Sequence, residues 1–461
     1  MMKRSQPILR HLSQQAAQSA LQRKAALWML LPLVALPGPS IAQAIPVATA
    51  SPISTGFTVP SLAGTLSYAV SASQSYSTNY FGNYGVNSST NLSGDLAFIT
   101  NSALYPFNTV FSGGRAWSSS GQSSYDFFNL SMTQGIHVQH WTLALSDSVN
   151  YLPGTATTGL SGVAGVGDLG VNPAQPGTTS GAGALPSQGV LTGFSSRVSN
   201  SSSLSVGRPI TGKTSMNASG SYSITRFLND STNLSTPGVN NDSDSASAGL
   251  SHRIDARNST GGSFTYSHSS FSGADFGIPE PGFSSQSASL QYSHQFTRKF
   301  GMSASAGPQW NNTGTPGSSR ALSVFANLTA SYTGKFSQAT MAYTRSSNSG
   351  YGVVGGAISD SVSFSISRTL DRVWLCALTT AYTQSSQLPS STSLPFTFHT
   401  TVVGVQVSRA IVRSLSAYAS YTLQNQSNQG IAAAVDLFSG LSNVTGFGLT
   451  YSPMAIHLGH S

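Results

Sequence analysis

Polar and apolar residues alternate along most of this chain, from Gly64 to Leu458. In the segment 288–296 (ASLQYSHQF) the even positions are mostly apolar or aromatic, and the odd positions are Ser and Gln. The segment 403–408 (VGVQVS) repeats the pattern. Successive side chains of a β-strand point to opposite faces, so each strand would have one apolar face and one small polar face. The pattern predicts an all-β protein.

The predicted strands are unusually long. Many span roughly 10 to 14 residues, whereas strands of soluble proteins are most often about 5–6 residues long, and a strand that crosses a membrane needs about 9–11. Thirteen strands follow a Gly/Pro/Ser-rich segment, 152–196, and the last of them is 443–456. Five strands precede that segment: 64–80, 88–99, 106–118, 123–134 and 137–151. The total of about 18, with 16 as the alternative count, predicts a single antiparallel transmembrane β-barrel over 64–461.

A basic motif recurs where the pattern predicts tight turns, and adjacent full copies lie 41 to 44 residues apart. Most of its basic residues have the parity of the apolar face, so we expect a basic ring at a lipid interface, where long side chains reach the phosphates. The ring would consist of Arg208, His252, His294, Arg368 and Arg409. The alternative is a set of solubilising basic turns at the end of a soluble sheet.

The segments between the tight turns are longer and rich in Gly, Pro, Asn and Ser. They are 229–242, 273–285, 312–319, 348–358, 386–397 and 426–442. Short turns at one end and longer loops at the other are typical of outer-membrane barrels.

The first 44 residues are predicted to be a signal peptide. A basic stretch precedes the apolar core 25–37, and Ala42-Gln43-Ala44 is a small-x-small cleavage site. Cleavage after Ala44 would leave 45–63 as a periplasmic lead; an uncleaved anchor is the alternative. Five of the 21 basic residues lie in this peptide, so the basic charge of the chain does not indicate a nucleic-acid partner.

Composition excludes several classes of protein. Charged residues make up 7% of the chain, against about 25% in ordinary globular proteins, so a cytosolic enzyme would have a poorly soluble surface. A single cysteine, Cys376, cannot form an intramolecular disulfide. With 39% hydrophobic and 10% aromatic residues, the chain is also unlike a disordered one.

Three motifs fit functional patterns but lack the required context. The segment 207–214 matches a P-loop, yet an alternating, strand-like segment follows it instead of a helix. The segment 165–170 matches a dinucleotide fingerprint without a βαβ unit around it. His457 and His460 have no carboxylate or thiol nearby in sequence. We therefore expect no cofactor, no metal site and no catalytic residue.

The mature chain resembles the Gram-negative outer-membrane β-barrel (porin-like) family. The export signal, the long alternating strands, the turn and loop asymmetry and the strand-end aromatics carry this resemblance; those aromatics include Tyr266, Tyr292, Tyr382 and Tyr421. One departure is that the last aromatic is Tyr451 and Pro453 interrupts the final strand. The resemblance implies a place in the cell outer membrane, contact with its lipids, insertion by the barrel assembly machinery, and an oligomer such as a trimer.

The lumen face of such a barrel would carry Ser, Thr, Asn, Gln and Gly. Barrels of about 16–18 strands normally enclose an aqueous channel, so we expect passive diffusion of small hydrophilic solutes. Arg226 and Arg345 are candidate pore-lining residues, and the segment 152–196, with Asp168 as its one charge, is a candidate constriction. A non-conducting structural or adhesin-like surface barrel is the alternative; an outer-membrane enzyme is disfavoured by the few carboxylates.

If the segment 152–196 narrows the pore, deleting 155–190 should raise single-channel conductance in a planar bilayer, because the deletion widens the narrowest part of the path. An unchanged conductance would show that this segment is not part of the pore.

Overall fold

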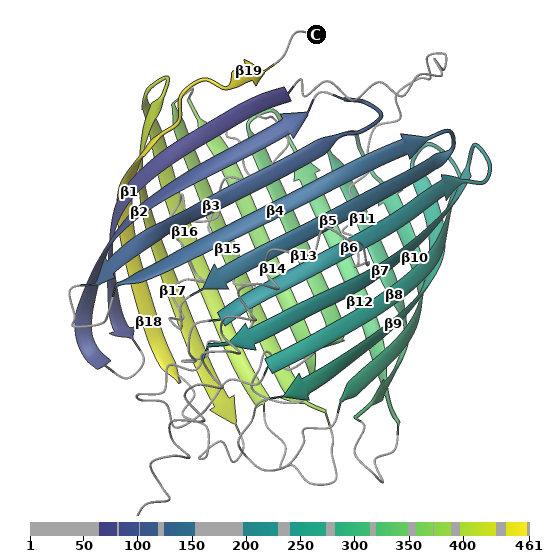
Figure 1. Cartoon of the computed structure of the whole chain (residues 1–461). Coiled ribbons are helices and arrows are strands. Elements are labelled where there is room, and N and C mark those ends of the chain that lie inside the picture. The colour runs from purple at the N-terminus through teal and green to yellow at the C-terminus, as the bar shows by residue number, and fades with distance from the viewer. Residues whose placement is uncertain are drawn as a thin grey trace, which may run out of the picture. The chain divides into compact units, whose positions relative to one another are not determined.

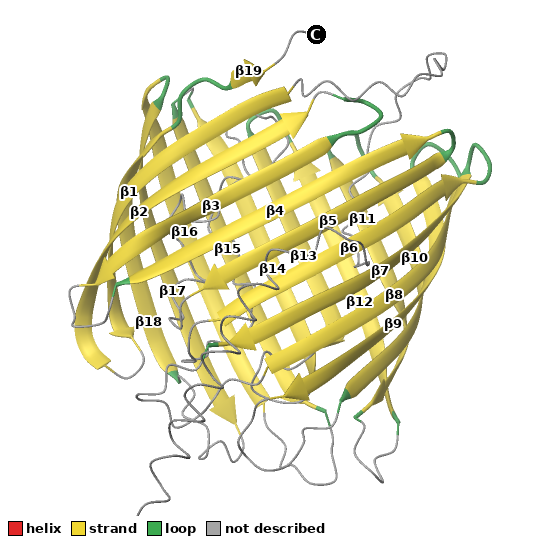
Figure 2. Ribbon diagram, viewed as in Figure 1, coloured by secondary structure: helices red, strands yellow, loops and turns green. Residues whose placement is uncertain are grey.

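The computed structural model describes twelve ranges of the chain, all within the unit Pro37–Ser461. They are 64–80, 83–100, 102–118, 124–152, 197–228, 240–272, 282–313, 320–348, 356–371, 373–388, 397–429 and 439–458. The predicted signal peptide 1–44, the lead 45–63 and all but the first residue of the segment 152–196 lie outside these ranges. Within them the chain forms strands joined by turns (Figures 1 and 2).

The strands follow one another in a single antiparallel sheet. They are β1 (Gly64–Tyr80), β2 (Asn83–Thr100), β3 (Phe107–Ser118), β4 (Tyr125–Val138), β5 (Trp141–Leu152), β6 (Arg197–Pro209), β7 (Thr214–Phe227), β8 (Asn240–Arg253), β9 (Asn258–Ser272), β10 (Phe283–Gln295), β11 (Phe300–Asn312), β12 (Ala321–Thr333), β13 (Ser337–Asn348), β14 (Ala357–Leu370), β15 (Trp374–Gln387), β16 (Thr397–Val412), β17 (Leu415–Gln429), β18 (Gly440–Tyr451) and β19 (Ile456–Leu458).

The sheet closes on itself. Each strand from β1 to β18 pairs with the next along the chain, and β18 pairs with β1 through contacts such as Val70 with Tyr451. A closed sheet has no free edge, so the ladder of backbone hydrogen bonds continues around the barrel. The predicted all-β barrel and its count of eighteen long strands are confirmed.

The last strand is interrupted at the proline that the sequence singles out. The sequence places this strand at 443–456 with Pro453 interrupting it, and β18 stops at Tyr451, before a short break that contains Pro453. Proline has no N–H to donate to a neighbouring strand, so it interrupts a ladder. Beyond the break, β19 pairs with the first residues of β1, Gly64–Leu66. The two pieces together complete most of the seam.

The connections differ in length between the two ends of the barrel. At one end, here named the turn end, neighbouring strands are joined by short turns such as Gln139–His140 and Arg413–Ser414. At the other, here named the loop end, β7 and β8 are joined by 228–239, and β15 and β16 by 388–396. The predicted asymmetry is therefore present.

The two faces of the sheet differ in polarity. One face carries large apolar side chains that remain exposed, such as Leu290 at 77% and Leu322 at 70%. The other face carries mainly small polar side chains, and its parity on β10 includes Phe283. Phe283 lies beside Gly356 and Leu388, next to β14 and β15. Such a contact between distant strands crosses the interior of a closed sheet, so the polar face is the lumen face.

Candidate functional site: the polar lumen wall

Serine hydroxyls pair across neighbouring strands of the lumen face. The Oγ atoms of Ser219 and Ser247 lie 2.6 Å apart, and those of Ser263 and Ser289 lie 2.9 Å apart. Further pairs are Ser75–Ser89, Ser146–Ser203, Ser215–Ser251, Ser221–Ser245, Ser243–Ser269, Ser259–Ser293 and Ser359–Ser385. A hydroxyl both donates and accepts, so each pair is satisfied within the wall and can still bond to water. The serine pairs make the wall polar without adding charge.

Few charged side chains face the lumen. In the described parts of the eighteen long strands, the register places Asp95, His137, Arg197 and Arg253 on the lumen face. Asp95 is 5% exposed, and Arg253 is the last residue of β8, at the turn end. The sequence prediction missed these residues, although their parity relative to the serines would have revealed them.

Arg226, a candidate pore-lining residue by its sequence position, does not have the parity of the lumen face. Arg226 has the parity of Tyr222, which is 40% exposed on the apolar face. Its Nη2 lies 2.6 Å from Oδ1 of Asp242, which has the same orientation on β8. The pair lies near the loop end of the outer face.

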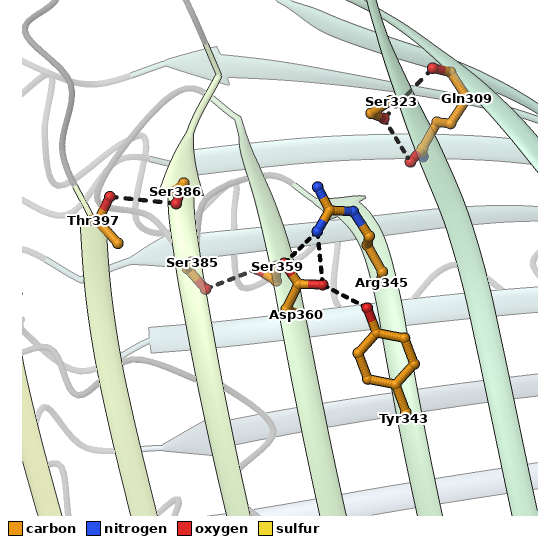
Figure 3. Close-up of polar contacts among 9 residues, drawn as sticks. All are labelled: Gln309, Ser323, Tyr343, Arg345, Ser359, Asp360, Ser385, Ser386 and Thr397. Carbon is orange, nitrogen blue, oxygen red and sulfur yellow. Dashed lines mark hydrogen bonds and ion pairs between the residues drawn. The ribbon is translucent and has the colours of Figure 1, made fainter.

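Arg345 is also on the outer face. It has the parity of Met341, which is 49% exposed. Its Nη1 lies 2.7 Å from Oδ2 of Asp360, and the Tyr343 hydroxyl donates to Oδ1 of the same carboxylate at 2.8 Å (Figure 3). Both arginines are near strand ends, as predicted. Because side chains alternate between the two faces of a strand, both arginine side chains point outward.

The five residues of the predicted basic ring share the outward parity and lie near the turn end. The guanidinium of Arg208 lies over the ring of Trp141 at 4.9 Å, and that of Arg409 over Trp374 at 5.1 Å. In each cation–π contact an apolar tryptophan ring carries a charged guanidinium on its face, an arrangement that suits a boundary between apolar and polar surroundings. His294 Nδ1 is 2.7 Å from Oδ1 of Asn258.

One turn at this end is fixed by a carboxylate. Asp255 accepts hydrogen bonds from the Asn258 side chain at 2.7 Å, and from the backbone N–H groups of Arg257 and Asn258 at 2.7 and 2.8 Å. These bonds favour the ionised form, so they lower the pKa of Asp255, with the Asn258 side chain contributing most.

An apolar belt separates the two polar margins of the outer face. On β15 the outward side chains from Trp374 to Tyr382 include Cys376, Leu378 and Thr380. Eight residues at about 3.4 Å per residue, on a strand tilted by about 40°, span roughly 20 Å along the barrel axis. That height is close to the apolar band of about 25 Å found on outer-membrane barrels.

The lumen face is divided into two parts by solvent exposure. On β4 to β12, here named the open wall, several lumen-facing polar side chains are exposed: Thr133, Ser201, Asn217, Ser263, Gln291 and Asn327. On β14 to β18 and β1 to β3, here named the closed sector, many are buried, including Ser71 at 2%, Thr400 at 3% and Gln424 at 2%. Solvent therefore reaches the wall mainly on one side of the lumen.

The functional motifs of the sequence do not form sites in the described residues. Residues 207–214 make the end of β6, a turn and the start of β7, so no helix follows the P-loop pattern. His457 lies on β19 with Nδ1 3.3 Å from Oγ1 of Thr65. The segment 165–170, Asp168 and His460 lie outside the described ranges.

Two kinds of feature are absent from the described residues. They contain no group of three His, Cys, Asp or Glu side chains that could hold a metal ion. In the same ranges there is no helix long and apolar enough to cross a membrane.

No protein-family model matches the chain, and a search of curated proteins finds no match. Solved structures similar to it include Pseudomonas aeruginosa OpdQ, with 9% identity, a TM-score of 0.40, and 85% of this chain and 99% of that chain covered. P. aeruginosa OccK2 (OpdF) has 9% identity and a TM-score of 0.42, and the match covers 85% of this chain and 98% of that chain. The outer membrane protein OpdK of the same organism has 9% identity and a TM-score of 0.39, and the match covers 85% of this chain and 99% of that chain. Values this low assign neither a family nor a solute.

Single cysteines in a Cys376→Ser background should distinguish the two parts of the lumen face. A charged, membrane-impermeant maleimide should label Ser201→Cys and Ser263→Cys at least about tenfold faster than Ser420→Cys, because Ser420 lies in the closed sector and thiol reactivity follows exposure. Equal rates at the three positions, measured on folded protein, would contradict the division.

Proposed function

We propose that this protein is a pore of the cell outer membrane through which small hydrophilic solutes diffuse passively. One observation carries the proposal: the closed sheet of eighteen long strands is apolar on its exposed outer face and polar on its lumen face. That arrangement reverses the pattern of a soluble protein and suits a barrel that has lipid outside and water inside. A barrel of this strand number is wide enough for an aqueous channel.

Solutes would pass along the open wall. Hydroxyl and amide groups there can exchange hydrogen bonds between water and a passing solute, so no site needs to bind tightly. Because the described lumen face has few charges, we infer weak discrimination between cations and anions. Diffusion needs no catalytic residue, cofactor or metal, and no nucleic acid takes part.

The outer face supports a definite orientation in the membrane. The basic ring of Arg208, His252, His294, Arg368 and Arg409 would lie at the lipid phosphates on the periplasmic side, and the loop end would face the outside. Outer-membrane lipids and the barrel assembly machinery are the partners that this placement implies. An oligomer, and the entry of the segment 152–196 into the lumen, remain predictions.

The alternative is a non-conducting structural or adhesin-like barrel. The closed sector favours it, because lumen-facing side chains there, such as Gln426 at 1% exposure, are shielded from solvent. The exposed side chains of the open wall favour a pore. Transport of a solute through the barrel decides between the two.

The lumen charges give a specific test of the pore. In a salt gradient, the wild-type reversal potential should correspond to a cation-to-anion permeability ratio within about threefold of one, because few charges line the path. Arg197→Ala, on the open wall, should shift the reversal potential toward cations. The matched control Arg345→Ala removes an outer-face charge and should leave it unchanged; a shift in the control as large as that of Arg197→Ala would contradict the assignment of faces.

A further inference from the structure

At the loop end, β13 separates from β12. The two strands pair only as far as Ala326 with Arg345, although β12 begins at Ala321 and β13 continues to Asn348. Over these last residues β13 still pairs with β14, through Ser347 with Ile358 and Asn348 with Ala357. The end of β13 therefore moves away from β12 together with the start of β14.

The end of β13 lies against strands on the far side of β12. The Ser347 hydroxyl is 3.1 Å from that of Ser285 on β10 and donates to Oδ1 of Asn311 on β11 at 2.9 Å. Gln309 Nε2 donates to Ser347 Oγ at 2.5 Å and to Ser285 Oγ at 2.9 Å. Ser347 thus reaches over the first residues of β12 to the lumen-facing side chains of β10 and β11.

The exposure of the opposite face gives the direction of this displacement. Trp310 and Leu322 are adjacent on the outer face at this height, and they remain 37% and 70% exposed. Ser285 and Asn311, on the lumen face, are 3% and 1% exposed. The end of β13 therefore leans into the lumen.

An apolar contact on the β14 and β15 side also holds these displaced strand ends in place. Phe283 at the start of β10 and Leu388 just after β15 are each 2% exposed. Between them lies Gly356, where a Cβ would be 3.1 Å from Leu388 Cδ1 and 3.3 Å from Phe283 Cδ2. Gly356 has φ +119° and accepts a hydrogen bond from the Leu388 N–H at 3.1 Å. Glycine adopts this φ without strain, so the close approach depends on it.

We propose that these contacts hold the end of β13 and the start of β14 inside the lumen as a fixed constriction at the loop-side mouth, and that the constriction sets the upper size of the solutes that pass. This strand-end ledge consists of Phe283, Ser285, Gln309, Asn311, Ser347 and Leu388. It is part of the hydrogen-bonded wall, it does not require the segment 152–196, and none of its six residues is charged. It therefore selects solutes by size and not by charge. The inference rests on the proposed pore function.

The first experiment tests whether the ledge exists, without any transport. In a Cys376→Ser background, Ser285→Cys with Ser347→Cys should form a disulfide on mild oxidation, because the two Oγ atoms are 3.1 Å apart. The control pair, Ser284→Cys with Ser347→Cys, places one thiol on the outer face and should remain reduced. A free Ser285→Cys/Ser347→Cys pair in folded protein, read by mass or by gel migration, overturns the proposal.

The second experiment tests its role. Phe283→Ala with Leu388→Ala should raise single-channel conductance on the order of twofold and admit larger polyethylene glycols, because pore width sets both. The outer-face control, Leu322→Ala, should match the wild type. If the double variant does not fold, Gln309→Ala with Ser347→Ala gives the same readout. Unchanged conductance and size limit in a folded ledge variant overturn the proposal.

The two experiments separate the failure of the ledge from the failure of the pore. A disulfide that forms in a barrel whose wild type conducts nothing overturns the pore function, and the constriction with it. A conducting wild type whose ledge variants behave identically overturns the ledge alone.

Discussion

Pairing of every backbone polar group along the wall is the constraint on which the rest of this structure depends. In lipid no water is present to satisfy an exposed N–H or C=O, and each unpaired group costs several kcal/mol. Closure of the sheet between β18 and β1 meets most of that requirement without a helix in the described ranges. The exception at the loop end is the start of β12, which does not pair with β13 before Ala326. Even the break at Pro453 is followed by a return to pairing, because β19 aligns with the first residues of β1.

Closure then determines how side chains are used. Once the backbone is hydrogen-bonded, alternate side chains must suit lipid on the outer face and water on the lumen face. The serine pairs make the lumen face suitable for water. Their hydroxyls bond to each other across strands, so the wall is polar while few charged side chains face the lumen. Charged residues lie mostly on the outer face near its two margins, as in the Arg345–Asp360 pair and at Arg409 beside Trp374.

Much of the fold could be predicted from the sequence because its signals are local. Alternation indicates strands, Gly- and Pro-rich segments indicate their ends, and Pro453 marks the interruption of β18. The direction of Arg226 and Arg345 is also encoded locally, in their parity with Tyr222 and Met341, whereas nearness to a strand end does not indicate the lumen face.

Other features had no local signal. The lean of β13 over β12 depends on contacts between β10, β11 and β13, and Phe283 meets Leu388 only because a closed sheet brings distant strands together. The division between the open wall and the closed sector is likewise a property of the assembled barrel. Period-two patterns determine which face a residue occupies, but not what lies opposite it across the lumen.

Single-channel conductance of the refolded mature chain, residues 45–461, in a planar bilayer tests the central claim most directly. A barrel that is polar inside, apolar outside and open along β4 to β12 should give stable, stepwise openings on the nanosiemens scale. A folded, heat-modifiable barrel that inserts into the bilayer and conducts nothing would contradict the pore and favour the structural or adhesive alternative.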